Sequence, residues 1–163
     1  IPASSAPGML YSLGPITLPA YLDRNEIAER RSGSEIAYSS FERWAEPLSK
    51  STARALFLDL SGALQTDRIL LFPWAGGARV DYMIEVEILQ FETTTERESI
   101  LAARWTIRDR GGRYLVLRES SFSHPAGHTT AEAVSAMGAA LNELAEEIAR
   151  AVRTLPAAEA QKP

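Results

Sequence analysis

The chain has 163 residues, of which 45% are hydrophobic and 23% are charged, a composition typical of a folded globular protein rather than a disordered one. Its formal net charge of −4 argues against a nucleic-acid-binding protein, because clustered lysine and arginine side chains supply most of the affinity for the phosphate backbone. Cysteine is absent, which excludes disulfides, thiolate nucleophiles, zinc–thiolate sites and iron–sulfur clusters.

The two ends of the chain predict connecting segments around one globular domain. Residues 1–8 contain two prolines, two serines and a glycine, which together favour a flexible tether. Pro156 ends the last predicted helix, and residues 156–163 are interpreted as a C-terminal tail. Residues 9–155 are then expected to form a single folded domain, a length within the normal range for one domain.

Short strands are predicted in the first quarter of the chain. Residues 9–18 carry recurring apolar side chains, and Gly14-Pro15 is expected to bend this strand. Two further short strands, at residues 27–31 and 35–41, are separated by turn-forming serine and glycine residues.

The first helix is predicted from residue 42 or 45 to residue 64. Pro47 suits an early helical position, where its missing N–H group leaves no hydrogen bond unmade. Leu56, Leu60 and Leu64 recur at steps of four, which places them on one apolar face of the helix.

The middle of the chain predicts an antiparallel meander. After a short apolar strand at residues 69–74, apolar and polar side chains alternate over residues 80–91, with a slip in the period at residues 89–90. A polar turn leads to a strand at residues 100–109, and a two-glycine turn connects it to another strand at residues 114–122.

A second amphipathic helix is predicted after Thr129. Thr129 and Glu132 have the spacing of a capping box, and apolar residues then recur at steps of three and four as far as Val152. Two long amphipathic helices packed on a sheet with a central meander predict the α/β (α+β) class, a single layered domain with a mixed or antiparallel sheet.

No arrangement of residues in the sequence predicts catalysis or metal binding. His124 and His128 are the only histidines, and Pro125 places them in a predicted solvent-exposed loop, where the helical spacing of a zinc site is lost. Glu85 and Glu87 share one strand face, which is interpreted as the solvated face of the meander rather than as an acid–base pair. We therefore expect neither an enzyme nor a bound cofactor or metal.

Two segments place large apolar side chains beside charged ones. One is residues 18–24, in the loop after the first strand, and the other is residues 43–48, at the start of the first helix. In a structural interpretation, Asp23 and Glu46 cap the helix or pair with Arg24 and Arg43, while Trp44 fills the core. In a functional interpretation the segments form a contact patch, because Trp, Tyr and Arg dominate interaction hot spots. The predicted partner-binding residues are Tyr21, Leu22, Asp23, Arg24, Arg43 and Trp44.

The same two segments carry a family resemblance. The motifs LPAYLDRNEI, RWAEPL, DYMIEVEILQFE and LAARWTIRD follow one another in this order, and AVSAMGAALNELAEEIA forms the closing helix. Over about residues 11–155 the chain resembles the ABC-type transport auxiliary lipoproteins, the family of the paraquat-inducible protein C.

The resemblance implies a fold and a function. Members have an α/β sandwich domain with a mixed sheet and are small periplasmic lipoproteins of Gram-negative bacteria, held at a membrane by an acylated N-terminal cysteine. They act beside membrane proteins of the mammalian-cell-entry (MCE) type, which conduct lipids between the two membranes. The chain is therefore expected to be a non-enzymatic accessory of an MCE-type or ABC-type lipid or solute transport system, anchored in the periplasm at the outer membrane.

Further expectations concern the membrane anchor, the oligomeric state and two other functional classes. The lipidated cysteine is absent from the sequence, so the membrane anchor would precede Ile1. A homo-oligomeric ring would suit a ring-shaped partner. Two other classes stay open: a soluble periplasmic carrier of a lipid or small molecule, which requires an apolar cavity of some hundreds of cubic ångströms, and a hydrolase with an unrecognised site.

Overall fold

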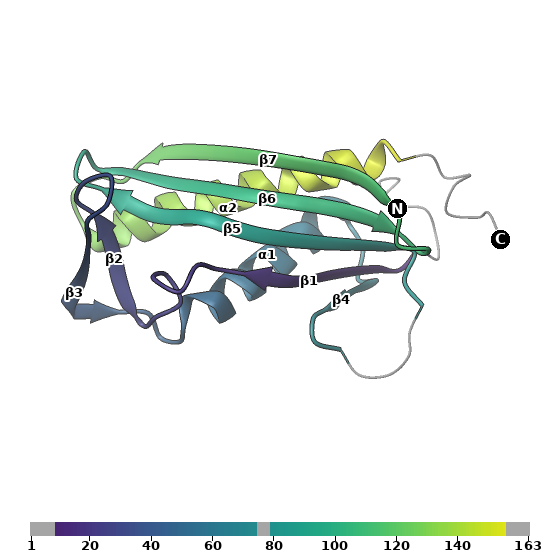
Figure 1. Cartoon of the computed structure of the whole chain (residues 1–163), viewed down its shortest axis with the longest axis horizontal. Coiled ribbons are helices and arrows are strands. Elements are labelled where there is room, and N and C mark those ends of the chain that lie inside the picture. Colours follow the sequence, from purple (N-terminus) through teal and green to yellow (C-terminus); the bar gives the residue numbers. More distant parts are fainter. Residues whose placement is uncertain (1–8, 75–78, 156–163) are drawn as a thin grey trace.

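The computed structural model of the chain describes residues 9–74 and 79–155, and the predicted tether and tail lie outside this part. The described residues form one mixed sheet of seven strands, with two helices packed on one of its faces (Figure 1). This arrangement confirms the predicted α/β (α+β) class. The elements are β1 (Tyr11–Thr17), β2 (Glu26–Arg30), β3 (Ile36–Arg43), α1 (Leu48–Leu64), β4 (Ile69–Leu71), β5 (Tyr82–Thr94), β6 (Glu98–Asp109), β7 (Tyr114–Pro125) and α2 (Thr130–Arg153).

β5 is the centre of the sheet and pairs with three other strands. Its first half lies parallel to β1 and its last residues lie parallel to β2, while β6 runs antiparallel along its length. β7 completes the predicted meander on the far side of β6, and β4 and β3 are the outer neighbours of β1 and β2. The long ribbon of β5, β6 and β7 therefore extends from one end of the molecule to the other (Figure 1).

Two irregularities that the sequence predicts in the strands are confirmed. The pairing of β5 with β6 shifts register at residues 88–90, and the pairing of β1 with β5 shifts at residues 13–16. Gly14 lies at the second shift with a φ of +116°, and a Cβ atom there would lie 2.6 Å from the Cβ atom of Phe72. Glycine is therefore required at this bend, both by the backbone conformation and by the neighbouring side chain.

The core lies between the sheet and the helices and follows the period-two pattern of the strands. Alternate residues of β6, among them Leu101, Trp105 and Ile107, are fully buried on the helix side. α2 contributes Leu144 and Ile148 to the same core. The residues between them in the strands point to the opposite face, so the hydrophobic period decides which face of the sheet receives the helices.

The predicted start of the first helix, at residue 42 or 45, is wrong, because α1 begins at Leu48. β3 extends as far as Arg43, and the amide of Trp44 donates a hydrogen bond to the carbonyl just before β2 (2.6 Å). Pro47 is the N-cap residue, with a ψ of 140°. Since the residue before a proline avoids the helical region, the helix does not extend upstream of Pro47.

Several strand boundaries also differ from the prediction. The strand predicted at residues 69–74 ends at Leu71, and β7 continues to Pro125, three residues past its predicted end. The prediction of a loop at His124 is therefore wrong, because this residue pairs with Ser99 in the sheet. β7 pairs only with β6 among the described strands, and an edge strand tolerates a proline that cannot donate to the ladder.

Replacing Thr129 with alanine is expected to lower the free energy of unfolding by about 1 kcal/mol, because it removes the cap of α2. The predicted capping box is present: the Thr129 hydroxyl accepts from the Glu132 amide (3.1 Å), and the Glu132 carboxylate accepts from the Thr129 amide (3.2 Å). Urea denaturation measures the change. Ser135→Ala, at an exposed position of the same helix, is the matched control, and an equal loss in both variants would contradict the capping role.

Candidate functional site

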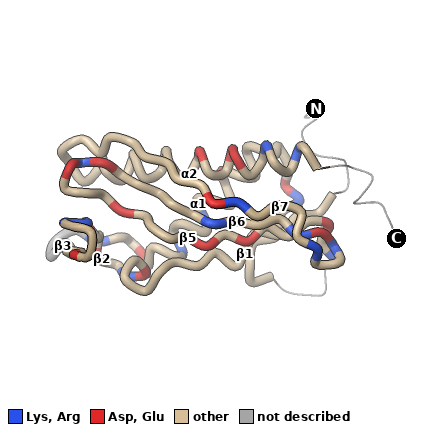
Figure 2. Tube along the Cα trace, turned by 45° about the horizontal axis from the view of Figure 1, so that its top comes forward, with Lys and Arg blue, Asp and Glu red and all other residues tan. Residues whose placement is uncertain are grey.

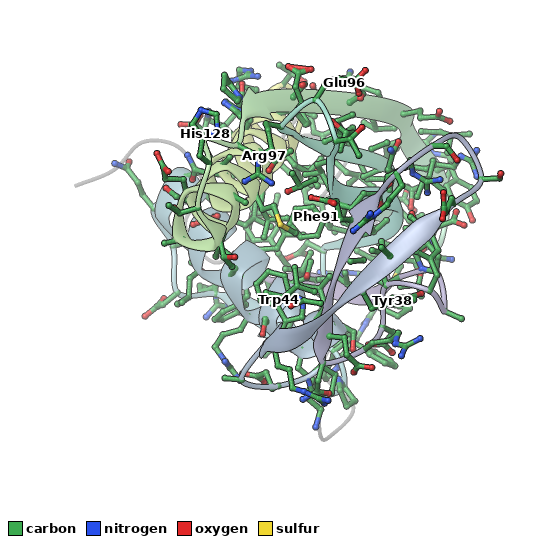
Figure 3. All side chains as sticks on the ribbon, turned by 90° about the vertical axis from the view of Figure 1, so that its left-hand side faces the viewer. Tyr38, Trp44, Phe91, Glu96, Arg97 and His128 are labelled. Carbon is green, nitrogen blue, oxygen red and sulfur yellow. The ribbon has the colours of Figure 1, made fainter. Side chains whose placement is uncertain are left out.

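The candidate site lies at the end of the molecule where β2, β3 and the first turns of both helices meet. β1 begins and α2 ends at the opposite end (Figure 1). Figure 3 looks directly at the site, with the helices on one side, β2 and β3 on the other, and Trp44 and Phe91 between them. Segments far apart in the sequence are therefore brought together here.

Arg24 and Arg43, two of the predicted partner-binding residues, both contact the carboxylate of Glu26. Arg24 donates a hydrogen bond to Glu26 (2.6 Å), and a guanidinium nitrogen of Arg43 lies 3.8 Å from the other carboxylate oxygen of Glu26. The hydrogen bond from Arg24 lowers the pKa of Glu26. The Arg24 guanidinium also lies over the ring of Tyr38, 3.9 Å from its centroid. Both arginines are exposed, so these contacts contribute little to stability and leave the two cations accessible.

Asp23 and Glu46 follow the structural interpretation only in part. Asp23 accepts a long hydrogen bond from the amide of Ser49 (3.4 Å) and thereby caps α1, as that interpretation expected. Glu46 does not follow the expectation of an ion pair with Arg43, because it accepts two hydrogen bonds from Arg54 (2.5 and 2.9 Å). Asp23 is exposed and directly precedes Arg24 in the sequence, so it lies at the same end of the molecule as the two arginines.

Tyr21 and Leu22 attach the loop after β1 to the sheet. Leu22 is only 2% exposed and belongs to the hydrophobic core. The Tyr21 hydroxyl donates to Glu92 (2.8 Å), and burial, more than this hydrogen bond, raises the pKa of Tyr21 to about 12. Glu92 is 1% exposed and also accepts a hydrogen bond from Arg30 (2.7 Å). Both predicted residues therefore hold the loop after β1 against the sheet, and Leu22 offers no surface to a partner.

The ion pair between Arg30 and the buried Glu92 is not predicted from the sequence. The slip in the hydrophobic period of β5 just before Glu92 was a signal that this side chain turns inward. A shift of one residue moves the following side chains to the other face of the sheet. Nothing local in the sequence identified the partner, since Arg30 lies 62 residues before Glu92.

An apolar hollow of about 120 Å³ opens beside Trp44, between the two helices and the end of β5. Trp44 is half-buried and packs against the core, which agrees in part with the structural interpretation of this residue. The main lining residues of the apolar hollow are Trp44, Leu48, Phe91, Met137 and Leu141.

A second, charged hollow of about 250 Å³ adjoins the first, between the β2–β3 pair and the start of α2. Val134 and Met137 border both hollows, and Val134 is 37% exposed. On the wall of the charged hollow, Glu29 lies between two arginines, at 3.8 Å from Arg31 and 3.5 Å from Arg97. Two guanidinium groups and one carboxylate leave an excess of one positive charge beside an apolar surface.

The histidines and the acidic pairs lie elsewhere. The Nε2 atom of His124 is hydrogen-bonded to Glu143 of α2, and His128 is exposed just before the cap of that helix. Within residues 9–74 and 79–155 no three acidic or histidine side chains are placed to hold a metal ion. The Glu85 and Glu87 side chains are 31% and 54% exposed and pair with Arg108 (2.9 Å) and Arg104 (3.3 Å), in agreement with the interpretation of this face of the meander as solvated. Figure 2 shows acidic and basic residues interleaved along these strands.

None of the helices in the described part of the chain is long and apolar enough to cross a membrane.

The comparison with protein families gives one result. Residues 2–149 match the family model described as the ABC-type transport auxiliary lipoprotein component. The match includes all the motifs that carry the resemblance and every residue of the candidate site. No curated protein of known function matches the chain.

Solved structures show the same fold. A crystal structure of an uncharacterized protein has a TM-score of 0.78 and 17% identity and covers 88% of this chain and 92% of its own. Protein XCC0632 from Xanthomonas campestris has a TM-score of 0.73 and 14% identity, with coverage of 88% and 86%. The PelC dodecamer from Paraburkholderia phytofirmans has a TM-score of 0.52 and 9% identity, with 88% of each chain covered. At these identities the likeness shows the fold alone.

Proposed function

Because the chain belongs to the ABC-type transport auxiliary lipoprotein family, we propose that it is a non-enzymatic accessory that docks an MCE-type transport complex at a membrane. A family of lipoproteins is membrane-anchored in the cell envelope, and an auxiliary transport component is not a known class of enzyme. More specifically, the protein is proposed to lie in the periplasm at the outer membrane, with an MCE-type membrane protein as its partner.

The observation that supports docking is the surface at the site end, which we call the corner patch and define as Asp23, Arg24, Arg43 and the exposed edge of Trp44. The patch combines two accessible cations with an aromatic side chain beside an apolar hollow. Interaction hot spots have this composition, with Trp and Arg enriched and an apolar centre inside a polar rim. Tyr21 and Leu22 belong to the proposal as the residues that hold this surface in place.

The position of the corner patch also fits an accessory held by its N-terminal end. β1 begins at one end of the molecule and the patch lies at the other (Figure 1). A lipid anchor upstream of β1 would leave the patch directed away from the anchoring membrane, where a partner can approach it.

The alternative of a soluble carrier receives less support from the geometry. A carrier of a whole lipid needs a continuous apolar cavity of some hundreds of cubic ångströms, and small-molecule sites have roughly 300–1,000 Å³. The two hollows at the site end have about 250 and 120 Å³ and are open to solvent. The dimensions of the hollows therefore favour a docking accessory over a carrier of a whole lipid.

Assembly of several copies is part of the proposal. The PelC structure, which has a similar fold, is a dodecamer, and this supports the assembly of several copies of this chain. A ring of copies would suit a ring-shaped partner. Multi-angle light scattering of the purified protein measures this directly, and a monomer at all concentrations would contradict the assembly.

Replacing Arg24 with alanine is expected to weaken partner binding about tenfold, or about 1.4 kcal/mol, without changing the free energy of unfolding. The Arg24 side chain is 43% exposed, so its loss removes a contact rather than packing. The first measurement is a pull-down from envelope extracts, which should recover an MCE-type protein, and the second is a titration of that protein with each variant.

The matched control for this titration is Arg113→Ala, at the opposite end of the molecule, where the side chain is 63% exposed. An equal affinity for the Arg24 variant, the Arg113 variant and the original chain would remove Arg24 from the patch. Repeated failure to recover any MCE-type protein would refute the proposed partner. Trp44→Ala differs from both, because it should reduce stability as well as binding.

A further inference from the structure

The two adjoining hollows together have the features of an amphiphile site. The apolar hollow is walled by Trp44, Phe91 and the α2 residues Met137 and Leu141, whereas the charged hollow carries two arginines. We infer that this groove binds a fatty acid, with its chain over the apolar hollow and its carboxylate at Arg31 and Arg97. This site shares Trp44 with the corner patch but uses neither Arg24 nor Arg43, and it does not depend on the identity of the transport partner.

The charges on the groove favour a carboxylate over a neutral or cationic headgroup. Glu29 is shared by Arg31 and Arg97 at 3.8 and 3.5 Å, so neither contact is a short ion pair. Arg97 is positioned by a hydrogen bond from its Nε atom to the carbonyl of Gly127 (2.7 Å). The arginines therefore keep donors available, and a monovalent anion would balance their excess charge.

The dimensions favour one acyl chain rather than two. Taken together, the two hollows reach only the lower end of the range of roughly 300–1,000 Å³ for small-molecule sites. Met137 borders both hollows, and its unbranched side chain can change rotamer so that a chain passes from one hollow to the other. Val134, half-exposed at the border, would cover part of the chain once it is bound.

Tryptophan fluorescence provides a direct test, because Trp44 is the one of the three tryptophans that lines the apolar hollow. Trp105 is fully buried in the core, and Trp74 packs edge-on against Phe72. Dodecanoate with a bromine atom at its terminal carbon, added below its micellar concentration, is expected to quench Trp44. The quenching should disappear in Trp44→Phe, whereas calorimetry should still detect binding of dodecanoate to this variant. Shortening the chain by one methylene should weaken binding about fourfold if that methylene is buried.

Two pairs of variants test the polar and apolar ends of the site. Arg31→Gln should weaken the binding of dodecanoate several-fold and Glu29→Gln should strengthen it, while neither should change the binding of dodecanol. Arg113→Gln, at the other end of the molecule, is the control for charge. Val134→Phe should block the groove, whereas Ser135→Phe, at the neighbouring exposed position, should leave binding unchanged.

The possible outcomes separate the occupants of the groove. Saturable quenching of Trp44 that prefers dodecanoate to dodecanol and is lost in Val134→Phe would support the site. Absence of quenching, or equal binding of the acid and the alcohol in every variant, would overturn it. A groove that is closed to the probe in an oligomer and open in the monomer would also overturn it, because the occupant would then be a second copy of the chain.

Discussion

Arg30→Met is expected to lower the free energy of unfolding by about 3–5 kcal/mol, one of the largest effects of a single substitution in this chain. Arg30 donates a hydrogen bond to Glu92 (2.7 Å), whose side chain is fully buried. Removal of the guanidinium leaves a buried carboxylate with the Tyr21 hydroxyl as its remaining side-chain donor among those described here. Urea denaturation of the variant and of the original chain measures the loss.

The double variant Arg30→Met with Glu92→Leu separates the cost of the unpaired charge from the value of the ion pair. Replacement of both partners by apolar side chains of similar size is often nearly neutral, so the double variant should regain most of the lost stability. A double variant that is as unstable as the sum of the two single changes would show that the charges do not act as a pair. Tyr21→Phe, which removes one hydrogen bond to Glu92, should cost less, about 1.5–3 kcal/mol.

Trp105→Ala is expected to cost a similar amount, about 3–5 kcal/mol, because it removes a large side chain from the centre of the core. Trp105 is 0% exposed and lies between the sheet and α2. Its indole Nε1 atom lies 3.2 Å from both Ser120 and Glu147, so the substitution also removes a donor that joins β7 to α2.

Trp105→Phe is the control for the hydrogen-bonding part of this effect. It keeps most of the apolar volume and loses only the indole N–H, so its cost should be clearly smaller than that of alanine. Equilibrium denaturation followed by circular dichroism measures both variants. Equal destabilisation by phenylalanine and alanine would mean that the polar contacts, rather than the packing, account for the role of Trp105.

The candidate site combines residues that the sequence identified and residues that it did not. Arg24, Arg43 and Trp44 stood out because large apolar and charged side chains alternate in two short segments, and the structure places both segments at one end of the molecule. Leu22 belonged to the same pattern but is buried, since a local pattern does not show which side chains of a loop turn inward. Glu26, which joins the two arginines, was not singled out.

The amino-acid sequence alone determined the elements, the fold class and the family. Period-two alternation, the slip in β5, the capping box of α2 and the glycine at the bend of β1 are short-range signals, because each depends on the backbone geometry of a few neighbouring residues. The end of β7 was misplaced, since pairing with β6 extends this strand beyond its local preference. The start of α1 was misplaced because β3 continues to Arg43 and Pro47 is the N-cap residue rather than a residue inside the helix.

Only the tertiary structure decided which side chains meet. Glu92 contacts Arg30 and Tyr21, which lie 62 and 71 residues earlier. The charged hollow forms where α2 passes the β2–β3 pair, and the apolar hollow forms between the two helices and the end of β5. The positions of such contacts depend on how the whole sheet twists and on where the helices pack on it, and no local pattern contains this information.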